Sequence, residues 1–149
     1  MFGPEPSWMS APPRGQSSDP RIITILVVDD DSTVGPWVQA ALEPVGYVVL
    51  HTIDPLEAIR MGKNRPGDLD LLLVDVVMPL MDGRKLAQRM CALCPRMKIL
   101  LMSGYGLSGL DETGWPTIAK PFSMEQLAQQ VAVTLPEKAP PPVARHGRR

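Results

Sequence analysis

Five short apolar runs alternate with amphipathic stretches along the middle of the chain, and this alternation constrains the fold more than any other feature. The runs are rich in Val, Ile and Leu, which is typical of parallel strands covered on both faces. Parallel strands need crossover connections, and the amphipathic stretches can form the helices that make them. The pattern therefore predicts one α/β domain with a five-stranded parallel sheet. The expected strands are residues 22–28, 47–50, 71–74, 98–102 and 117–119.

Helices are expected in the first three connections and after the last strand. Each starts at a short polar residue, whose side chain can accept a hydrogen bond from the first turn. The first helix begins less cleanly, because Gly35-Pro36 is expected to delay its start or to make its first turn irregular. The expected start residues are Ser32, Asp54, Asp82 and Ser123.

Composition and charge exclude several classes of protein. The chain has 149 residues and a formal net charge of −1, which argues against a general nucleic-acid binder. Its apolar runs are far shorter than the roughly 20 residues of a membrane-spanning helix, and its start lacks the pattern of a secretory signal. Two cysteines are too few to staple a domain of this size. We therefore expect a cytoplasmic protein that binds neither nucleic acid nor membrane.

Proline-rich segments flank the predicted domain. Residues 1–20 and 136–149 hold more than half of the 17 prolines and show no periodic apolar pattern. Such segments bury too little apolar surface to offset the entropy of ordering them, so we expect disordered tails around a domain at residues 21–135. The second tail is too short to form an output domain, and we expect the domain to act alone.

Polar side chains stand at the ends of four of the predicted strands. The first strand ends in Asp29-Asp30-Asp31, the third in Asp75, the fourth in Ser103 and the fifth in Lys120. Because the carboxyl ends of parallel strands lie at one edge of a sheet, these groups are expected to converge on one pocket. Clustered carboxylates repel one another unless a cation lies among them, and oxygen ligands suit Mg²⁺. The sequence thus predicts a magnesium site with a hydroxyl and an ammonium group beside it.

The chemistry that fits this set is phosphoryl transfer to a carboxylate. Asp75 is the candidate nucleophile, which would form an aspartyl phosphate. The metal and Lys120 would neutralise charge on the transferring group, and the Ser103 hydroxyl can donate a hydrogen bond to it. The alternative for any one of the carboxylates is a solvated loop residue or a helix cap. That alternative weakens when four strand ends carry matching groups.

At these residues the sequence resembles the CheY-like receiver (phosphoacceptor) domain of two-component response regulators. The resemblance implies a doubly wound, flavodoxin-like sheet in the order 2-1-3-4-5, in a signalling domain rather than an enzyme. It also implies phosphorylation of Asp75 in a Mg²⁺-dependent phosphorelay reaction, by a histidine kinase or a histidine phosphotransfer protein. The resemblance covers Ile22 to Leu135 and is carried by Val27-Val28-Asp29-Asp30, Asp75 to Gly83, Met102-Ser103-Gly104-Tyr105 and Lys120-Pro121-Phe122.

The resemblance further implies a role for each residue of the pocket. The implied ligands of Mg²⁺ are Asp30, Asp75 and the backbone carbonyl of Val77, with Asp29 assisting through water. Ser103 would be the switch hydroxyl and Lys120 the phosphate-pairing lysine. The Lys120-Pro121 peptide bond is expected to be cis, which would aim the lysine into the pocket.

Two departures from the family affect the mechanism. Receivers usually carry an aromatic residue three positions before the lysine, and here that position is Thr117, so any switch from Ser103 must use other groups. The segment from Ser103 to Lys120 is also short and rich in glycine. Each glycine disfavours helix by roughly 1 kcal/mol relative to Ala. We therefore expect the fourth helix to be missing or reduced to one turn. Apolar surface on strands four and five would then be exposed, and we expect a homodimer or a partner on that face.

Other function classes stay open. A pseudo-receiver scaffold, which is not phosphorylated, is favoured by Thr117 and the missing helix, whereas the complete acidic set with its lysine favours phosphorylation. A small metal-dependent phosphatase would need an acid/base carboxylate two residues after the nucleophile, where this chain has Val77.

Residues 104–109 match G-x-G-x-x-G without the context of a dinucleotide site. Cys91 and Cys94 match C-x-x-C without that of a zinc or redox site, and we expect them to pack in the core.

Overall fold

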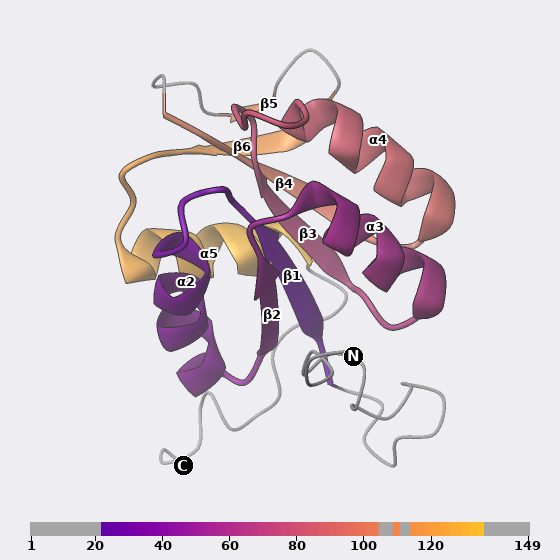
Figure 1. Ribbon diagram of the computed structural model, residues 1–149. Coiled ribbons are helices and arrows are strands. Elements are labelled where there is room, and N and C mark those ends of the chain that lie inside the picture. The colour runs from indigo at the N-terminus through magenta and orange to yellow at the C-terminus, as the bar shows by residue number, and fades with distance from the viewer. Residues whose placement is uncertain (1–21, 105–108, 111–113, 136–149) are drawn as a thin grey trace, which may run out of the picture.

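The computed structural model describes residues 22–104, 109–110 and 114–135. Within them, a central sheet lies between two layers of helices (Figure 1). The strands are β1 (Thr24–Val28), β2 (Val48–Thr52), β3 (Leu71–Asp75), β4 (Lys98–Ser103), β5 (Gly109–Leu110) and β6 (Pro116–Ala119). The helices are α2 (Val34–Leu42), the short 3-10 helix η2 (Glu43–Val45), α3 (Pro55–Asn64), α4 (Gly83–Leu93) and α5 (Met124–Thr134). The expected tails, residues 1–20 and 136–149, lie outside the described part of the chain.

The sheet has the strand order β2-β1-β3-β4-β6-β5. All pairs from β2 to β6 are parallel, which confirms the predicted five-stranded sheet in the order 2-1-3-4-5. The two-residue strand β5 was not predicted; it pairs antiparallel with β6 at the edge. Two residues are too few to show the alternation by which a strand is recognised.

The predicted loss of the fourth helix agrees with the structure. Between β4 and β6, none of the described residues is helical, and β5 occupies part of the connection. Residues 105–108 and 111–113 lie outside the described part, so most of the G-x-G-x-x-G segment does too. The described residues thus form four α-helices, where the family pattern has five.

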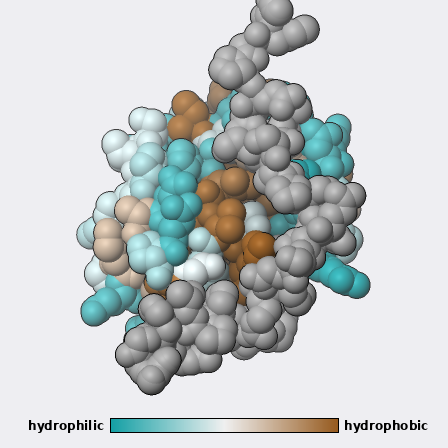
Figure 2. All heavy atoms as spheres, turned by 90° about the horizontal axis from the view of Figure 1, so that it is seen from below, coloured by the Kyte–Doolittle hydropathy of each residue, from teal (hydrophilic) through white to brown (hydrophobic). Residues whose placement is uncertain are grey.

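The two central strands are buried on both faces, as their unbroken apolar sequence predicts. Leu71 and Leu73 of β3 face α2 and α5, whereas Leu72 and Val74 face α3 and α4. All four are 0% exposed, and burying a leucine side chain contributes roughly 1.5–3 kcal/mol. Seen from the side where β1 and β2 begin, hydrophobic side chains gather in the middle of the face (Figure 2).

Three of the four helix starts lie where the sequence predicts them. The Asp54 side chain accepts a hydrogen bond from the Leu56 N–H, and Asp82 caps α4 in the same way. Ser123 and Gln126 form a reciprocal capping box at α5. The fourth prediction, Ser32, is wrong by about one residue: α2 begins at Val34 after Thr33, because Asp31 binds the Thr33 N–H instead.

The expectation that β4 and β6 expose apolar surface is wrong for the described residues. Leu101 is fully buried, and Thr117 and Ile118 are less than one tenth exposed. Trp115 packs against the cluster that contains Leu101, and α5 covers Ile118 from the other face. The segment before β6 therefore takes over part of the covering that a helix would provide. Among the described residues, no helix is both long and apolar enough to cross a bilayer.

Candidate functional site

The carboxyl ends of four adjacent strands bring the predicted polar residues to one edge of the sheet. Asp29 follows β1, Asp75 ends β3, Ser103 ends β4 and Lys120 follows β6. Backbone hydrogen bonds set this register: the Val76 N–H donates to the Met102 carbonyl, and the Lys120 N–H donates to the Ser103 carbonyl at 2.8 Å. The site is thus built into the parallel ladders rather than into loops.

Lys120 bridges two of the carboxylates. Its Nζ lies 2.7 Å from Oδ2 of Asp29 and 3.1 Å from Oδ1 of Asp75. The lysine side chain is 27% exposed, whereas that of Asp29 is 2% exposed. The expected cis bond between Lys120 and Pro121 is present. The next residue, Phe122, packs edge-on against Trp37 of α2 with 5.6 Å between ring centroids, which fixes the segment after the lysine.

Three carboxylates can reach a common point at this edge. Asp29, Asp30 and Asp75 each offer an oxygen within 4.8 Å of the others, with Asp30 exposed and the other two buried. One lysine cannot balance three carboxylates, so the pocket keeps an excess of negative charge. An all-oxygen donor set with excess negative charge is the kind of site that Mg²⁺ occupies. The residues present therefore fit the predicted metal.

The pKa values at the site reflect that excess charge. Burial raises the pKa of Asp75 above its ordinary value, and the nearby charge of Asp29 raises it further, against the opposing effect of Lys120. Desolvation alone would lower the pKa of Lys120, but hydrogen bonding to Asp29 and the charges of Asp29 and Asp75 outweigh it and raise that pKa. The surroundings thus favour the charged ammonium form of Lys120, whereas they disfavour the ionised form of Asp75.

Ser103 and Val77 also lie near these groups, at the same edge of the sheet. Ser103 is 1% exposed and stands on the strand next to Asp75. Val77 lies two residues beyond Asp75 in the connection to α4, with its side chain 55% exposed. Thr117 is farther from the edge, because it pairs with Leu101 in the β4–β6 ladder. Its Oγ1 is buried and has no hydrogen-bond partner among the described residues.

The structure adds two contacts that the sequence analysis did not predict for this site. The Asp31 N–H donates to Oδ1 of Asp29 at 2.9 Å, so that both oxygens of Asp29 are held. Gly83, at the start of α4, lies so close to Asp75 that a Cβ there would come within 2.0 Å of the Asp75 carbonyl oxygen. The Asp-x-Asp spacing of an Asx turn signals the first contact; nothing local signals the second.

The C-x-x-C pair packs as predicted. Cys94 is buried in the cluster under α3 and α4, and Cys91 packs against the same cluster. Burial raises the pKa of both thiols, which disfavours the reactive thiolate. These cysteines are structural.

A doubly wound parallel sheet with clustered aspartates and a lysine at its carboxyl edge defines a receiver-type fold. Residues 25–132 match the family described as the response regulator receiver domain, and the chain belongs to that family. Receiver domains are signalling modules that bind Mg²⁺ at an acidic pocket and interact with histidine kinases or phosphotransfer proteins. This chain carries the aspartate cluster at the corresponding edge.

Known proteins and structures agree with this assignment. The chain is 32% identical over 112 residues to the response regulator receiver protein CpdR of Brucella abortus, covering 72% of this chain and 92% of CpdR. It is 32% identical over 113 residues to the sensor kinase CckA of the same species, but spans only 12% of that protein's length. The crystal structure of the receiver domain from the hybrid histidine kinase CckA aligns with a TM-score of 0.67 at 32% identity, covering 75% of this chain and 98% of that one.

Proposed function

We propose that this chain is a single-domain response regulator that accepts a phosphoryl group on Asp75 and signals through protein contacts. The donor would be the phosphohistidine of a histidine kinase or of a histidine phosphotransfer protein in the cytoplasm. The observation that carries the proposal is the placement of the Lys120 ammonium, 2.7 Å from Asp29 and 3.1 Å from Asp75. An ammonium held between a fixed carboxylate and the nucleophile can pair with an oxygen of the arriving phosphoryl group.

Asp75 would enter the reaction as a carboxylate. One of its oxygens forms a bond to phosphorus while the P–N bond of the phosphohistidine breaks, and the electron pair of that bond stays on the imidazole. No general base is needed, because the nucleophile gives up no proton. Lys120 neutralises charge on the transferring group, and the Ser103 hydroxyl donates a hydrogen bond to a second phosphoryl oxygen. Mg²⁺, when bound, supplies the remaining charge neutralisation.

The residues that would hold Mg²⁺ are those expected from the sequence. Asp30 and Asp75 would bind it directly with the backbone carbonyl of Val77, and Asp29 would act through water. The clustering of the three carboxylates and the contrast between buried Asp75 and exposed Asp30 support this set. A divalent ion there could be approached from solvent while still contacting the nucleophile.

The switch that follows phosphorylation would use hydroxyl groups rather than an aromatic ring. Ser103 would turn toward the phosphoryl group, and Thr117 stands on the neighbouring strand with a buried hydroxyl that has no hydrogen-bond partner among the described residues. A buried hydroxyl without a partner costs free energy, which a shift in this region can recover. The place of Thr117 in β6 supports a conformational change of this strand as the response to phosphorylation.

Self-association or partner binding through the face of β4 and β6 is also part of the proposal. No described residue between these strands is helical, and the half-buried Trp115 lies at that face against the core. Sedimentation velocity with and without a small phosphodonor tests it. A larger species that appears only on phosphorylation and is lost in Trp115→Ala supports the dimer. A monomer under both conditions contradicts it.

Intact mass spectrometry after incubation with a small phosphodonor tests phosphorylation itself. The wild type is expected to gain one phosphoryl group only when Mg²⁺ is present, and Asp75→Asn is expected to gain none. Asp68→Asn is the matched control, since Asp68 pairs with Arg65 in the connection before β3, at the other end of that strand from the pocket. No Mg²⁺-dependent gain in the wild type would instead favour the pseudo-receiver scaffold.

A further inference from the structure

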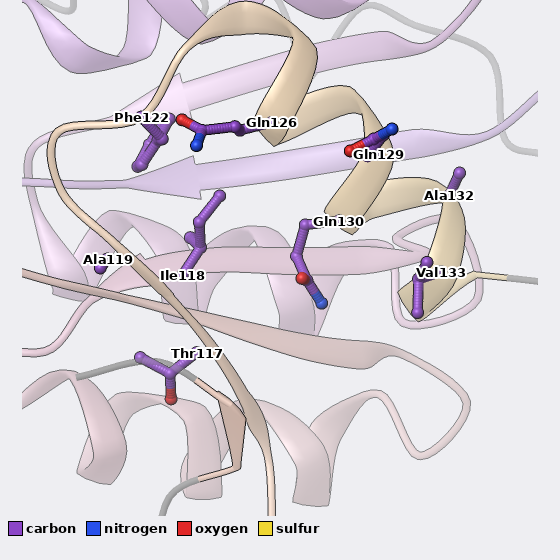
Figure 3. A pocket seen from close by; sticks show the side chains of 9 residues that line it. All are labelled: Thr117, Ile118, Ala119, Phe122, Gln126, Gln129, Gln130, Ala132 and Val133. Carbon is purple, nitrogen blue, oxygen red and sulfur yellow. The ribbon is translucent and has the colours of Figure 1, made fainter. Parts of the chain in front are cut away.

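A groove lies between β6 and α5, away from the aspartate pocket. Its main part is a cavity of 620 Å³ between the strand and the helix. Figure 3 shows Gln126 and Gln130 projecting from α5 into the space beside Phe122 and Ile118. A second cavity of 470 Å³ shares Gln130 with the first and continues toward Trp115 and the last turn of α5. The two cavities together define the α5 groove.

The lining of the α5 groove has a distinct chemistry. Among the described residues, none that lines the main cavity is charged, and Lys98 is the only charged one that lines the second. Within the described part of the chain, the Gln130 side chain makes only a long 3.4 Å contact from its Nε2 to Thr134 Oγ1, so its amide N–H groups can donate to a bound segment. Glutamine amides above an apolar floor with an aromatic ring suit an extended backbone that offers carbonyls and apolar side chains. A proline-rich segment has those properties, since it has acceptors but few N–H groups.

The chain itself supplies such a segment immediately after the groove. Val133 and Thr134, in the last turn of α5, line the second cavity, and the sequence continues from Leu135 into Ala139-Pro140-Pro141-Pro142-Val143. At about 3.1 Å per residue, residues 136–149 can span about 43 Å in a polyproline II conformation. The whole of α5 is only about 16 Å long at 1.5 Å per residue. The segment can therefore turn back at the end of α5 and lie along the groove.

We propose that the α5 groove binds residues 139–143 of the same chain in a polyproline II conformation. The amides of Gln126 and Gln130 donate to the segment's carbonyls, and its proline rings pack against Trp115. The direct linkage to α5 gives a high effective concentration, and the stiffness of proline lowers the entropy lost on binding. The bound segment covers β6 and Trp115 and therefore competes with the association proposed above for the face of β4 and β6. This inference goes beyond the proposed function and does not depend on phosphorylation of Asp75.

Nuclear Overhauser effects measured on the isotope-labelled full chain test this proposal. Cross-peaks are expected between the Pro140–Pro142 ring protons and the Trp115 indole, together with shifted side-chain amide signals of Gln130. In the variant with Pro140, Pro141 and Pro142 all changed to Ala, the cross-peaks are lost and the Gln130 amide signals move. Changing Pro12 and Pro13 to Ala is the matched control and leaves both unchanged. Gln130→Leu weakens the cross-peaks, whereas Gln88→Leu at an exposed position of α4 does not.

Each contrary outcome is distinct. Absence of these cross-peaks in the wild type, with Gln130 signals identical in the triple variant, overturns the proposal. Cross-peaks that appear between labelled and unlabelled chains in a mixed sample and fade on dilution show that the segment of a second copy binds, which also overturns binding within one chain. Cross-peaks from residues 4–13 instead would assign the groove to the other proline-rich segment.

Discussion

Asp29 and Lys120 are joined by a 2.7 Å hydrogen bond although 91 positions separate them in the sequence. Asp29 follows β1 and Lys120 follows β6, so the lysine reaches across the ends of the intervening strands β3 and β4. On the way it contacts Asp75 at the end of β3. This contact links the segment after β6 to the proposed phosphoacceptor at the centre of the sheet.

Removing the lysine should destabilise the fold. Lys120→Met leaves Asp29 buried beside Asp75 without its cation, and we expect a loss of about 2–3 kcal/mol in the free energy of unfolding, since one buried partner is left unpaired. Urea denaturation measures this loss, with Lys85→Met at an exposed position of α4 as the control. Saturating Mg²⁺ should restore part of the stability. Equal stability of the two variants without Mg²⁺ would show that the ion pair between Lys120 and Asp29 makes no net contribution to the free energy of unfolding.

Neutralising the proposed phosphoacceptor, Asp75, should instead stabilise the metal-free fold. Because burial and Asp29 raise the pKa of Asp75, its ionised form is unfavourable in the metal-free fold. Asp75→Asn should therefore raise the melting temperature in chelator by a few degrees, the shift that about 1 kcal/mol produces. The gain should shrink when Mg²⁺ is added, because only the wild type keeps that ligand. A lower melting temperature for Asp75→Asn in chelator contradicts the charge-crowding account.

Magnesium should stabilise the wild type by mass action. A ligand at 100 times its dissociation constant contributes about 2.7 kcal/mol when it binds only the folded state. Thermal melts with MgCl₂, compared with NaCl at matched ionic strength, measure the effect. Asp30→Asn should reduce it strongly, whereas Asp82→Asn, which keeps a capping side chain at α4, should not. An identical shift from NaCl would indicate ionic strength rather than a metal site.

Gly83 should not tolerate a side chain. A Cβ would lie 2.0 Å from the Asp75 carbonyl oxygen, so Gly83→Ala must displace the start of α4 from the site. We expect a destabilisation of about 1–3 kcal/mol, typical of overpacking, together with slower phosphorylation. Gly67→Ala is the control, since nothing lies within 4 Å of a Cβ there. Chemical denaturation measures the free energy of unfolding of both variants. Equal values for Gly83→Ala and Gly67→Ala would be inconsistent with the close approach of Gly83 to the Asp75 carbonyl.

The Thr117 hydroxyl, which has no partner in the described part of the structure, should lower the stability of the resting state. Thr117→Val removes it with little change of shape, and we expect the free energy of unfolding to rise by about 1 kcal/mol. Thr117→Ser keeps the hydroxyl and should not be stabilised. If the hydroxyl takes part in the switch, Thr117→Val should still accept phosphate but lose the phosphorylation-dependent change in β6, seen by amide hydrogen exchange. Unaltered exchange in Thr117→Val would remove Thr117 from the switch.

Much of the sheet and pocket could be predicted, because both depend on local signals in the chain. Buried parallel strands are apolar throughout, and Asp54, Asp82 and Ser123 are strong N-caps. These signals were enough to predict which segments are strands or helices and in what order they come. The pocket followed because parallel strands place Asp29, Asp75 and Lys120 at one edge whatever the details of packing.

The remaining features depend on contacts that have no local signature. The approach of Gly83 to Asp75 is a packing distance between a helix and a strand end. The packing of Trp115 against the cluster that contains Leu101 depends on the path of the chain before β6, where two paired residues are too few to predict a strand. The wrong expectation of a bare apolar face had this origin.

The most direct test of the central claim is to locate the phosphoryl group after reaction with a small phosphodonor and Mg²⁺, by tandem mass spectrometry of rapidly prepared peptides. We predict that the group is on Asp75 in the wild type and that Lys120→Met forms much less of the modified peptide. Modification at another residue, or an unmodified Asp75 peptide under conditions where Mg²⁺ stabilises the protein, would contradict the assignment of Asp75 as the phosphoacceptor.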